Sequence, residues 1–357
     1  MKEKKVRIVD IARMAGVSPG TIDRVLHNRG RIAKDKKQRI EAIIEQMGYR
    51  PNMAARMLAK SCCFTIAVVA PSYEGESYWK QVCEGIRKAS DEQNQYDLRV
   101  EFIHFDQYSR TSFDEAVADV EWSRYNGVVI ATLFESRVVE LSARLDELAI
   151  PYVYIDSPVE GQSDMAYFGV DAHASGYIAG KMLCRELQPE SAIVVVHVKF
   201  RRSDISVQMR KREEGLMRYL AEEGHVRELC HFELDPQRGA TCAADFERLV
   251  SRFDAPVGVL VLNSRVYELA EFLSSAECDW SDKLVVAGFE AIRPNIEAMQ
   301  RGRVRFLISQ RPELQGYNAV KALGNLFVGD VRPERVNYMP IDILIPENIA
   351  YYSNYKL

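Results

Sequence analysis

The chain has no apolar run near the roughly 20 residues that a membrane-spanning helix needs. Met1 leads directly into charged residues, so we expect no secretion signal. The seven cysteines are scattered, and the adjacent pair Cys62-Cys63 lacks the spacing of a metal or redox motif. These absences predict a cytoplasmic protein with reduced thiols and no membrane partner.

Common enzyme signatures are also missing. The first β-rich run ends in AVVAPSYEG, without the glycines of a dinucleotide-binding turn, and neither GxxxxGK[ST] nor HExxH occurs. The histidines are dispersed along the chain, at His27, His104, His173, His197, His225 and His231. We therefore predict no catalytic residue, no metal and no cofactor.

The charge is unevenly distributed. Residues 1–60 carry 15 Lys and Arg against 6 Asp and Glu, whereas the remaining residues carry 32 against 45. A small basic segment followed by a large acidic one is typical of a nucleic-acid reader coupled to another domain. At 357 residues, the chain is long enough for two or three domains.

The stretch IVDIARMAGVSPGTIDRVLHNRG, residues 8–30, predicts two short helices joined by a glycine-containing turn. Apolar residues recur at helical spacing before Gly16, Ser18 has the chemistry of an N-cap, and Pro19 falls at the first helical position. This pattern is typical of a helix-turn-helix, whose second helix enters the major groove. A generic helical hairpin with one solvated face remains the alternative.

The outer face of the second helix carries side chains that can reach DNA: Thr21, Arg24, His27 and Asn28. Arg24 is the first choice for a base contact, because arginine reads guanine with two hydrogen bonds. A third helix is predicted over 34–47. Residues 52–60 follow it as a short segment of helix-forming residues with Asn52 as a possible N-cap, which is either ordered on DNA or an ordinary linker.

From residue 64 onward, continuous apolar strands alternate with amphipathic helices. Strands are expected at 64–70, 99–105, 127–130, 152–155, 193–198, 227–233, 257–262 and 284–289, with helices between them. This alternation predicts doubly wound α/β sheets with parallel strands, arranged in two blocks with a cleft between them.

Polar and aromatic residues follow many of these strands. They are Ser72, Tyr73, Tyr78, Trp79, Asp106, Thr132, Phe134, Asp156, Arg201, Arg202, Asn263, Glu290 and Gln310. In open α/β sheets, ligands bind beyond the carboxyl ends of the strands. Carboxylates, amides and aromatic faces suit a polyhydroxylated ligand such as a carbohydrate. Each residue alone could equally be part of a solvated loop.

The first sixty residues resemble the LacI-type family of bacterial transcription regulators. The resemblance rests on DIA-x-x-AGVS, T-x-x-RVL-x-N, GYRPN and a following A-x-x-L. It implies a homodimer on a palindromic operator, with Ser18 and Thr21 at phosphates, Arg24 at bases and Asn28 on the same face. It also implies that Asn52 and Ala55 lie in a hinge helix and that Leu58 wedges into the minor groove.

The rest of the chain resembles that family's core, which is similar to periplasmic binding proteins. YIDSP, RKREEGL, VLVLNSR and ISQRPELQ align Asp156, Arg212, Asn263 and Gln310 with the family's pocket residues, and Arg212 replaces Arg201 and Arg202 as the ligand-binding arginine. Glu290 stands where the family usually has Asp. Tyr78 and Trp79 occupy the stretch where an aromatic residue lines the pocket.

The domains expected from this resemblance are a headpiece at 1–51, a hinge at 52–61 and a core at 62–357. The core would divide into one subdomain of 62–168 and 309–338 and another of 169–308 and 339–357. The function expected is regulation of transcription, controlled by a small polar ligand. A sugar-binding transport protein and a sugar- or nucleotide-processing enzyme with a fused headpiece are the alternatives.

Overall fold

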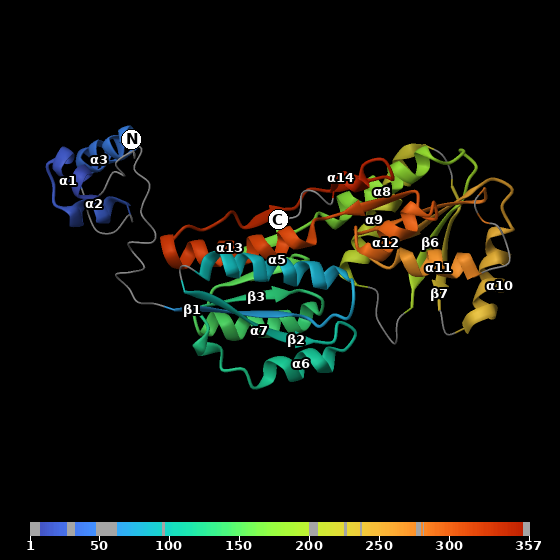
Figure 1. Cartoon of the computed structure of the whole chain (residues 1–357), viewed down its shortest axis with the longest axis horizontal. Coiled ribbons are helices and arrows are strands. Elements are labelled where there is room, and N and C mark those ends of the chain that lie inside the picture. Colours follow the sequence, from blue (N-terminus) through green and yellow to red (C-terminus); the bar gives the residue numbers. More distant parts are fainter. Residues whose placement is uncertain are drawn as a thin grey trace. The chain divides into compact units, whose positions relative to one another are not determined.

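The computed structural model describes residues 8–26, 33–47, 63–94, 97–199, 206–224, 227–235, 238–275, 280 and 282–352. The chain divides into two compact units, one of 1–62 with 325–331 and the other of 63–324 with 332–357. Figure 1 shows the elements of each unit. Within the described ranges, no helix combines the length and apolar content needed to cross a bilayer.

The described part of the first unit contains three helices, α1 (Ile8–Ala15), α2 (Pro19–Leu26) and α3 (Lys34–Gln46). Gly16 ends the turn after α1 with a φ of 66°, a conformation that glycine adopts without steric cost. Ile11, Ile22 and Ile40 contribute one residue from each helix to a shared buried core. The predicted helix-turn-helix is therefore present, and α2 begins at Pro19 as predicted.

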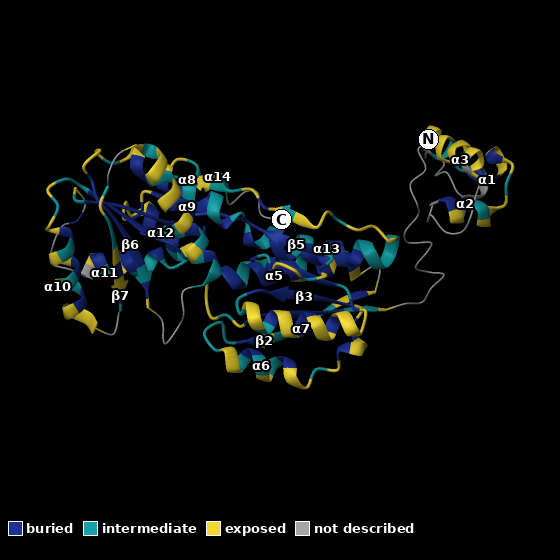
Figure 2. Cartoon of the chain, turned by 180° about the vertical axis from the view of Figure 1, so that it is seen from behind, coloured by how far each residue is buried: buried dark blue, intermediate teal, exposed yellow. Residues whose placement is uncertain are grey.

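The second unit contains two six-stranded sheets, each covered by helices on both faces (Figures 1 and 2). The first has the order β11-β5-β4-β3-β1-β2 and is wholly parallel. Its strands are β1 (Phe64–Pro71), β2 (Leu98–Phe105), β3 (Gly127–Ala131), β4 (Tyr152–Asp156), β5 (Ala166–Gly169) and β11 (Val336–Tyr338). The helices α5 (Tyr78–Gln93) and α13 (Pro312–Gly329) cover one face, and α6 (Arg110–Ala118) and α7 (Glu135–Glu147) the other. A 3-10 turn, η2 (Trp122–Arg124), precedes β3.

The second sheet has the order β12-β10-β9-β8-β6-β7. Its strands are β6 (Ile193–Val198), β7 (Leu229–Leu234), β8 (Val257–Val261), β9 (Leu284–Phe289), β10 (Phe306–Ser309) and β12 (Asp342–Leu344). The helices α8 (Ala172–Arg185) and α9 (Val207–Glu223) pack on one face. The helices α10 (Gly239–Val250), α11 (Val266–Ser275) and α12 (Arg293–Gln300) pack on the other, and α14 (Ile349–Tyr352) follows β12.

The two-block α/β prediction is therefore confirmed, with one difference. The edge strand β12 runs antiparallel to β10, whereas the sequence predicted only parallel strands. The chain passes between the two sheets after β5, after β10 and after β11, and the last passage is a direct connection without a helix.

Candidate functional site

The outer face of α2 presents polar side chains at the start of the helix. Ser18 precedes α2, and its carbonyl oxygen accepts the first helical hydrogen bond from Thr21 N at 2.9 Å. The hydroxyls of Ser18 and Thr21 lie 3.0 Å apart. Arg24 is exposed, and its Nε donates to Gly20 O at 3.2 Å, which leaves the other guanidinium nitrogens on the solvent side. The predicted DNA contacts Asn28, Asn52, Ala55 and Leu58 lie outside the described residues.

A cleft of about 2030 Å³ opens at the carboxyl ends of the strands of both sheets. With Arg212 in place of Arg201 and Arg202, eleven of the twelve predicted ligand residues line it: Ser72, Tyr73, Tyr78, Trp79, Asp106, Phe134, Asp156, Arg212, Asn263, Glu290 and Gln310. The twelfth, Thr132, lies behind the lining and is 2 % exposed. Its hydroxyl donates to Ser157 O at 2.6 Å, so this side chain braces the loop that follows β4. The earlier candidates Arg201 and Arg202 lie outside the described residues.

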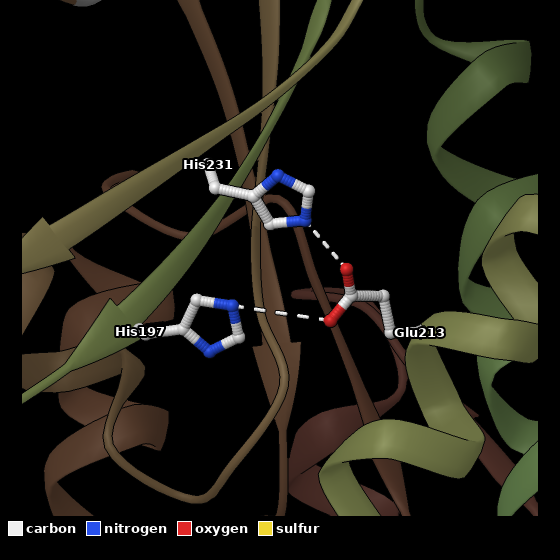
Figure 3. A group of neighbouring side chains, drawn as sticks. All are labelled: His197, Glu213 and His231. Carbon is white, nitrogen blue, oxygen red and sulfur yellow. Dashed lines mark hydrogen bonds and ion pairs between the residues drawn. The ribbon is translucent and has the colours of Figure 1, made fainter. Parts of the chain in front are cut away.

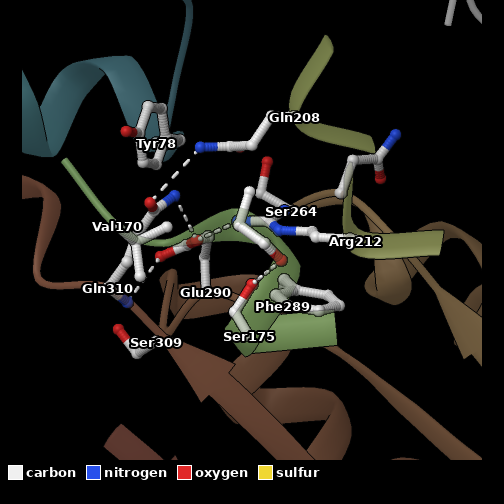
Figure 4. Close-up of polar contacts among 12 residues, drawn as sticks. Tyr78, Val170, Ser175, Gln208, Arg212, Ser264, Phe289, Glu290, Ser309 and Gln310 are labelled. Atoms are coloured by element: carbon white, nitrogen blue, oxygen red, sulfur yellow. Dashed lines mark hydrogen bonds and ion pairs between the residues drawn. The ribbon is translucent and has the colours of Figure 1, made fainter. Parts of the chain in front are cut away.

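An ion pair of buried side chains occupies the floor of the cleft. Arg212 comes from α9 and Glu290 from the end of β9; they are 2 % and 1 % exposed, and Arg212 Nη2 lies 3.5 Å from Glu290 Oε1. Arg212 Nη1 also donates to Leu262 O at 2.7 Å, and its guanidinium carbon lies 3.9 Å from the centre of the Phe289 ring. Gln310 Nε2 donates to Glu290 Oε1 at 2.8 Å. Figure 4 shows these groups converging.

One polar atom of this arrangement remains without a protein partner. Arg212 Nε is buried and has no hydrogen-bond partner among the described residues. A buried donor without a partner loses its hydration without compensation, so Arg212 Nε would gain by donating a hydrogen bond to an oxygen of a ligand.

A second carboxylate enters from the opposite lobe. Asp156 lies at the end of β4, and Gln208 Nε2 from α9 lies 3.3 Å from its Oδ1. The same amide nitrogen lies 3.4 Å from Gln310 Oε1 (Figure 4). Gln208 therefore links Asp156 of the first lobe to Gln310 at the end of β10. Tyr78 is 8 % exposed and donates its hydroxyl to Gln315 Oε1 at 3.1 Å.

Burial shifts the acidity of these groups. It raises the pKa of Glu290 to about 7 and that of Asp156 to about 6, and the neighbouring Arg212 guanidinium offsets part of each rise. Burial also raises the pKa of Tyr78 well above its ordinary value, so its hydroxyl stays protonated near neutral pH. Glu290 can therefore accept hydrogen bonds when ionised and donate one when protonated.

Both cleft carboxylates lie on backbone that ordinarily favours glycine. Asp156 has a φ of 82° and Glu290 a φ of 72°. Each is held by a buried side chain: Tyr167 donates its hydroxyl to Asp156 O at 3.1 Å, and Asn295 Nδ2 donates to Glu290 O at 2.9 Å. Strained residues held by their surroundings are concentrated at functional sites, so this geometry supports a binding role for both carboxylates.

The structure adds cleft residues that were not predicted. They are Gln208, Tyr108 and Arg265. Arg265 Nη1 donates a hydrogen bond to the Tyr108 hydroxyl at 2.9 Å and so links the two lobes. Arg265 also pairs with Glu268 on α11. Tyr108 lies three residues beyond the end of β2 and Arg265 four beyond β8, so extending the search past the first residues after each strand would have found them.

These side chains can bind an uncharged polar ligand through a mixture of donors and acceptors with an aromatic wall. The fold and the cleft define a two-lobed ligand-binding core, in one chain with a helix-turn-helix unit. Residues 7–52 match the family described as bacterial regulatory proteins, lacI family, and residues 66–330 match the periplasmic binding protein domain. The chain belongs to the LacI family of bacterial regulatory proteins.

Similar proteins carry related descriptions. A solved structure titled as a putative LacI transcriptional regulator from Bacteroides fragilis is 30% identical, with a TM-score of 0.75, and the match covers 82% of this chain and all of that one. The HTH-type transcriptional regulator IdnR of Escherichia coli is 25% identical over 53% of each chain, so the chain spans about half the length of the curated relatives it matches. GanP, a glucose-galactose binding protein from Geobacillus stearothermophilus, shares the core fold at 17% identity with a TM-score of 0.66, over 80% of this chain and 99% of that one.

Proposed function

We propose that the protein is a ligand-responsive transcription regulator that acts in the cytoplasm and binds a palindromic DNA operator as a homodimer. The observation that carries the proposal is that one chain combines an exposed Arg24 on a helix-turn-helix with a cleft whose floor is the buried pair Arg212–Glu290. The first feature suits DNA and the second suits a small polar ligand, and their presence in one chain favours control of DNA binding by that ligand.

The proposed effector is a carbohydrate. Arg212 and Gln310 offer donors, Asp156 and Glu290 offer acceptors, and Trp79 provides an apolar wall, which together match the hydroxyls and ring faces of a sugar. The effector would change the relative populations of two cleft conformations and thereby the operator affinity. The change is limited by the difference in the effector's affinity for the two conformations.

The proposal is tested on the full-length protein. Selection from a random duplex library should enrich a two-fold symmetric sequence, and the affinity for it should fall on the order of 10³-fold between 50 and 200 mM salt if about six phosphates are contacted. Failure to enrich any sequence would contradict the DNA-binding half of the proposal.

The effector is then sought by thermal shift against a panel of carbohydrates and nucleosides, because a ligand of the native state raises the melting temperature. A carbohydrate that raises it should also change the affinity for the selected DNA. Stabilisation by nucleosides alone would overturn the proposed ligand class, and stabilisation without any change in DNA affinity would overturn the proposed control.

A further inference from the structure

Three side chains, two of which line the cleft, form a cluster apart from the Arg212–Glu290 pair. They are His197 on β6, His231 on β7 and Glu213 on α9, and their ligand-type atoms all lie within 4.8 Å of one another. Figure 3 shows the two imidazoles and the carboxylate turned toward a common point. Within the described ranges, no other group of three such side chains has this spacing.

The strand register explains the cluster. β6 and β7 are parallel, with Val195 opposite His231 and His197 opposite Glu233, so both histidines project from one face of the sheet. That face is covered by α9, whose Leu216 packs with Val195 in the core beneath it. Glu213, nearly one helical turn before Leu216, therefore meets the histidines at the end of the strands, where the cleft opens.

The distances suit a small cation. His231 Nε2 lies 2.5 Å and His197 Nε2 lies 3.9 Å from the two oxygens of Glu213, and the two rings are nearly parallel. Bonds of about 2.0–2.2 Å in a tetrahedral zinc site place neighbouring ligand atoms roughly 3.4 Å apart. A rotation of the Glu213 side chain would lengthen the short separation and shorten the long one.

The environment of His197 argues for a ligand that the protein itself does not supply. The His197 side chain is 18 % exposed, its Nδ1 is buried without a hydrogen-bond partner in the described structure, and its Nε2 is beyond hydrogen-bond distance of Glu213. A metal ion between Nε2 and the Glu213 carboxylate would bridge this gap, whereas Nδ1 would remain without a protein partner in the part of the chain that the structure describes.

We propose that His197, Glu213 and His231 bind a divalent transition-metal ion of the Zn²⁺ type. Two imidazoles and one carboxylate are the protein ligands of a common class of open zinc site, whereas Mg²⁺ and Ca²⁺ prefer oxygen ligands alone. His197 and His231 both line the cleft, so the remaining coordination position is open to water or to an oxygen of a bound ligand. This inference does not depend on the function proposed above.

The test is calorimetric titration of Zn²⁺ into full-length protein that has been freed of metal with a chelator. We expect one site per chain. His231→Asn and Glu213→Gln should each weaken binding by at least about tenfold, because each removes one of three ligands. His104→Asn, a histidine outside the cluster, is the matched control and should leave the affinity unchanged. The His231 side chain is half exposed, so its replacement leaves the core intact, which circular dichroism in chelator checks.

Substitution with Co²⁺ identifies the ligands independently of affinity. A visible spectrum of a nitrogen- and oxygen-ligated ion that disappears in His231→Asn is expected. Thiolate-to-cobalt charge transfer would instead assign the ion to cysteines and overturn the proposal. So would the absence of binding, or equal affinity in the wild type and both cluster variants. None of these outcomes bears on operator binding, which is measured separately.

Discussion

At the scale of single residues, the cleft brings two carboxylates and one guanidinium together, and Glu290 and Arg212 are almost fully buried. Burial raises the pKa of Glu290 to about 7 from an ordinary value near 4.5. Between these two pH values, Glu290 keeps its proton in the folded protein and has lost it in the unfolded chain. The sign follows from linkage: where the folded state binds more protons, stability falls as pH rises. Glu290 therefore destabilises the fold progressively between about pH 4.5 and pH 7.

We predict that Glu290→Gln removes this pH dependence. Glutamine resembles the protonated carboxyl, so the variant and the wild type should have similar unfolding free energies at pH 5. At pH 8 the variant should be the more stable, by up to about 3 kcal/mol. Urea denaturation at the two pH values measures the difference, with the exposed Glu147→Gln as control. A difference that does not change with pH would show that the Glu290 carboxyl is ionised throughout.

Arg24 is the residue on which sequence preference should depend. Removing one bidentate base contact costs about 1–3 kcal/mol of discrimination, so Arg24→Ala should weaken binding to the selected operator by about 5- to 150-fold. Non-specific duplex binding should change much less, because it depends on phosphate contacts. Competition titrations compare the two duplexes. Arg39→Ala, at an exposed position of α3, should retain the preference, and a preference retained by Arg24→Ala would remove Arg24 from base recognition.

Only part of this chemistry could be predicted from the sequence. Residues directly after strands, such as Asp156 and Asn263, were found because parallel strands end at one edge of a sheet. Arg212 lies inside α9 and follows no strand, so only its resemblance to a family motif indicated it. The neighbours His197 and His231 could not be paired, because their contact depends on the register of β6 with β7, which no local pattern specifies.

At the scale of elements, both lobes bring two helices together at glycines. A Cβ added to Gly176 on α8 would lie 1.8 Å from Arg212 O, and one added to Gly215 on α9 would lie 2.0 Å from His173 O. In the first lobe, a Cβ added to Gly85 on α5 or to Gly316 on α13 would likewise lie too close to the backbone of the facing helix. The close approach of α8 and α9 fixes where α9 presents Gln208, Arg212 and Glu213 to the cleft, so these glycines position both proposed ligand sites.

We predict that Gly176→Ala lowers the free energy of unfolding by about 1–3 kcal/mol or more, because the backbones of α8 and α9 must separate to make room for the added Cβ. Lys181→Ala, on the exposed side of the same helix, should have little effect. Chemical denaturation measures both. The displaced α9 should also weaken effector binding in the fraction that remains folded. An unchanged denaturation midpoint would show that the helices separate at little cost.

Element prediction succeeded where patterns are long and failed where strands are short. The start of α2 and both ends of α3 were located to within one residue, because a proline marks the start of α2 and α3 has enough turns for its pattern to show. β5, β11 and β12 have only four, three and three residues, too few for any periodicity to show. Their strand conformation is set by pairing with longer neighbours, which is tertiary information.

At the scale of the whole molecule, the claim to be tested is that the cleft and the DNA-binding unit are energetically coupled. An effector that changes operator affinity by some factor must itself be bound with an affinity changed by the same factor when the operator is present. Coupling of this kind is typically about 5- to 150-fold. The effector identified in the thermal-shift panel should therefore have two dissociation constants, one with operator present and one without. Their ratio should equal the factor by which the effector changes the operator affinity.

Arg212 allows the coupling to be separated from binding to DNA. Arg212→Lys keeps the positive charge beside Glu290 but loses the planar fork that suits paired oxygen acceptors. We predict that it binds the operator as tightly as the wild type while losing most of its response to the effector, as measured by fluorescence anisotropy across effector concentrations. Lys211→Arg, the adjacent basic residue on α9, is the matched control and should respond normally. Arg212 lies in the second unit, whereas the basic residues 1–60 lie in the first. If Arg212→Lys loses operator affinity in the absence of effector, Arg212 supports the DNA-binding form itself. The cleft would then control DNA binding even without a ligand.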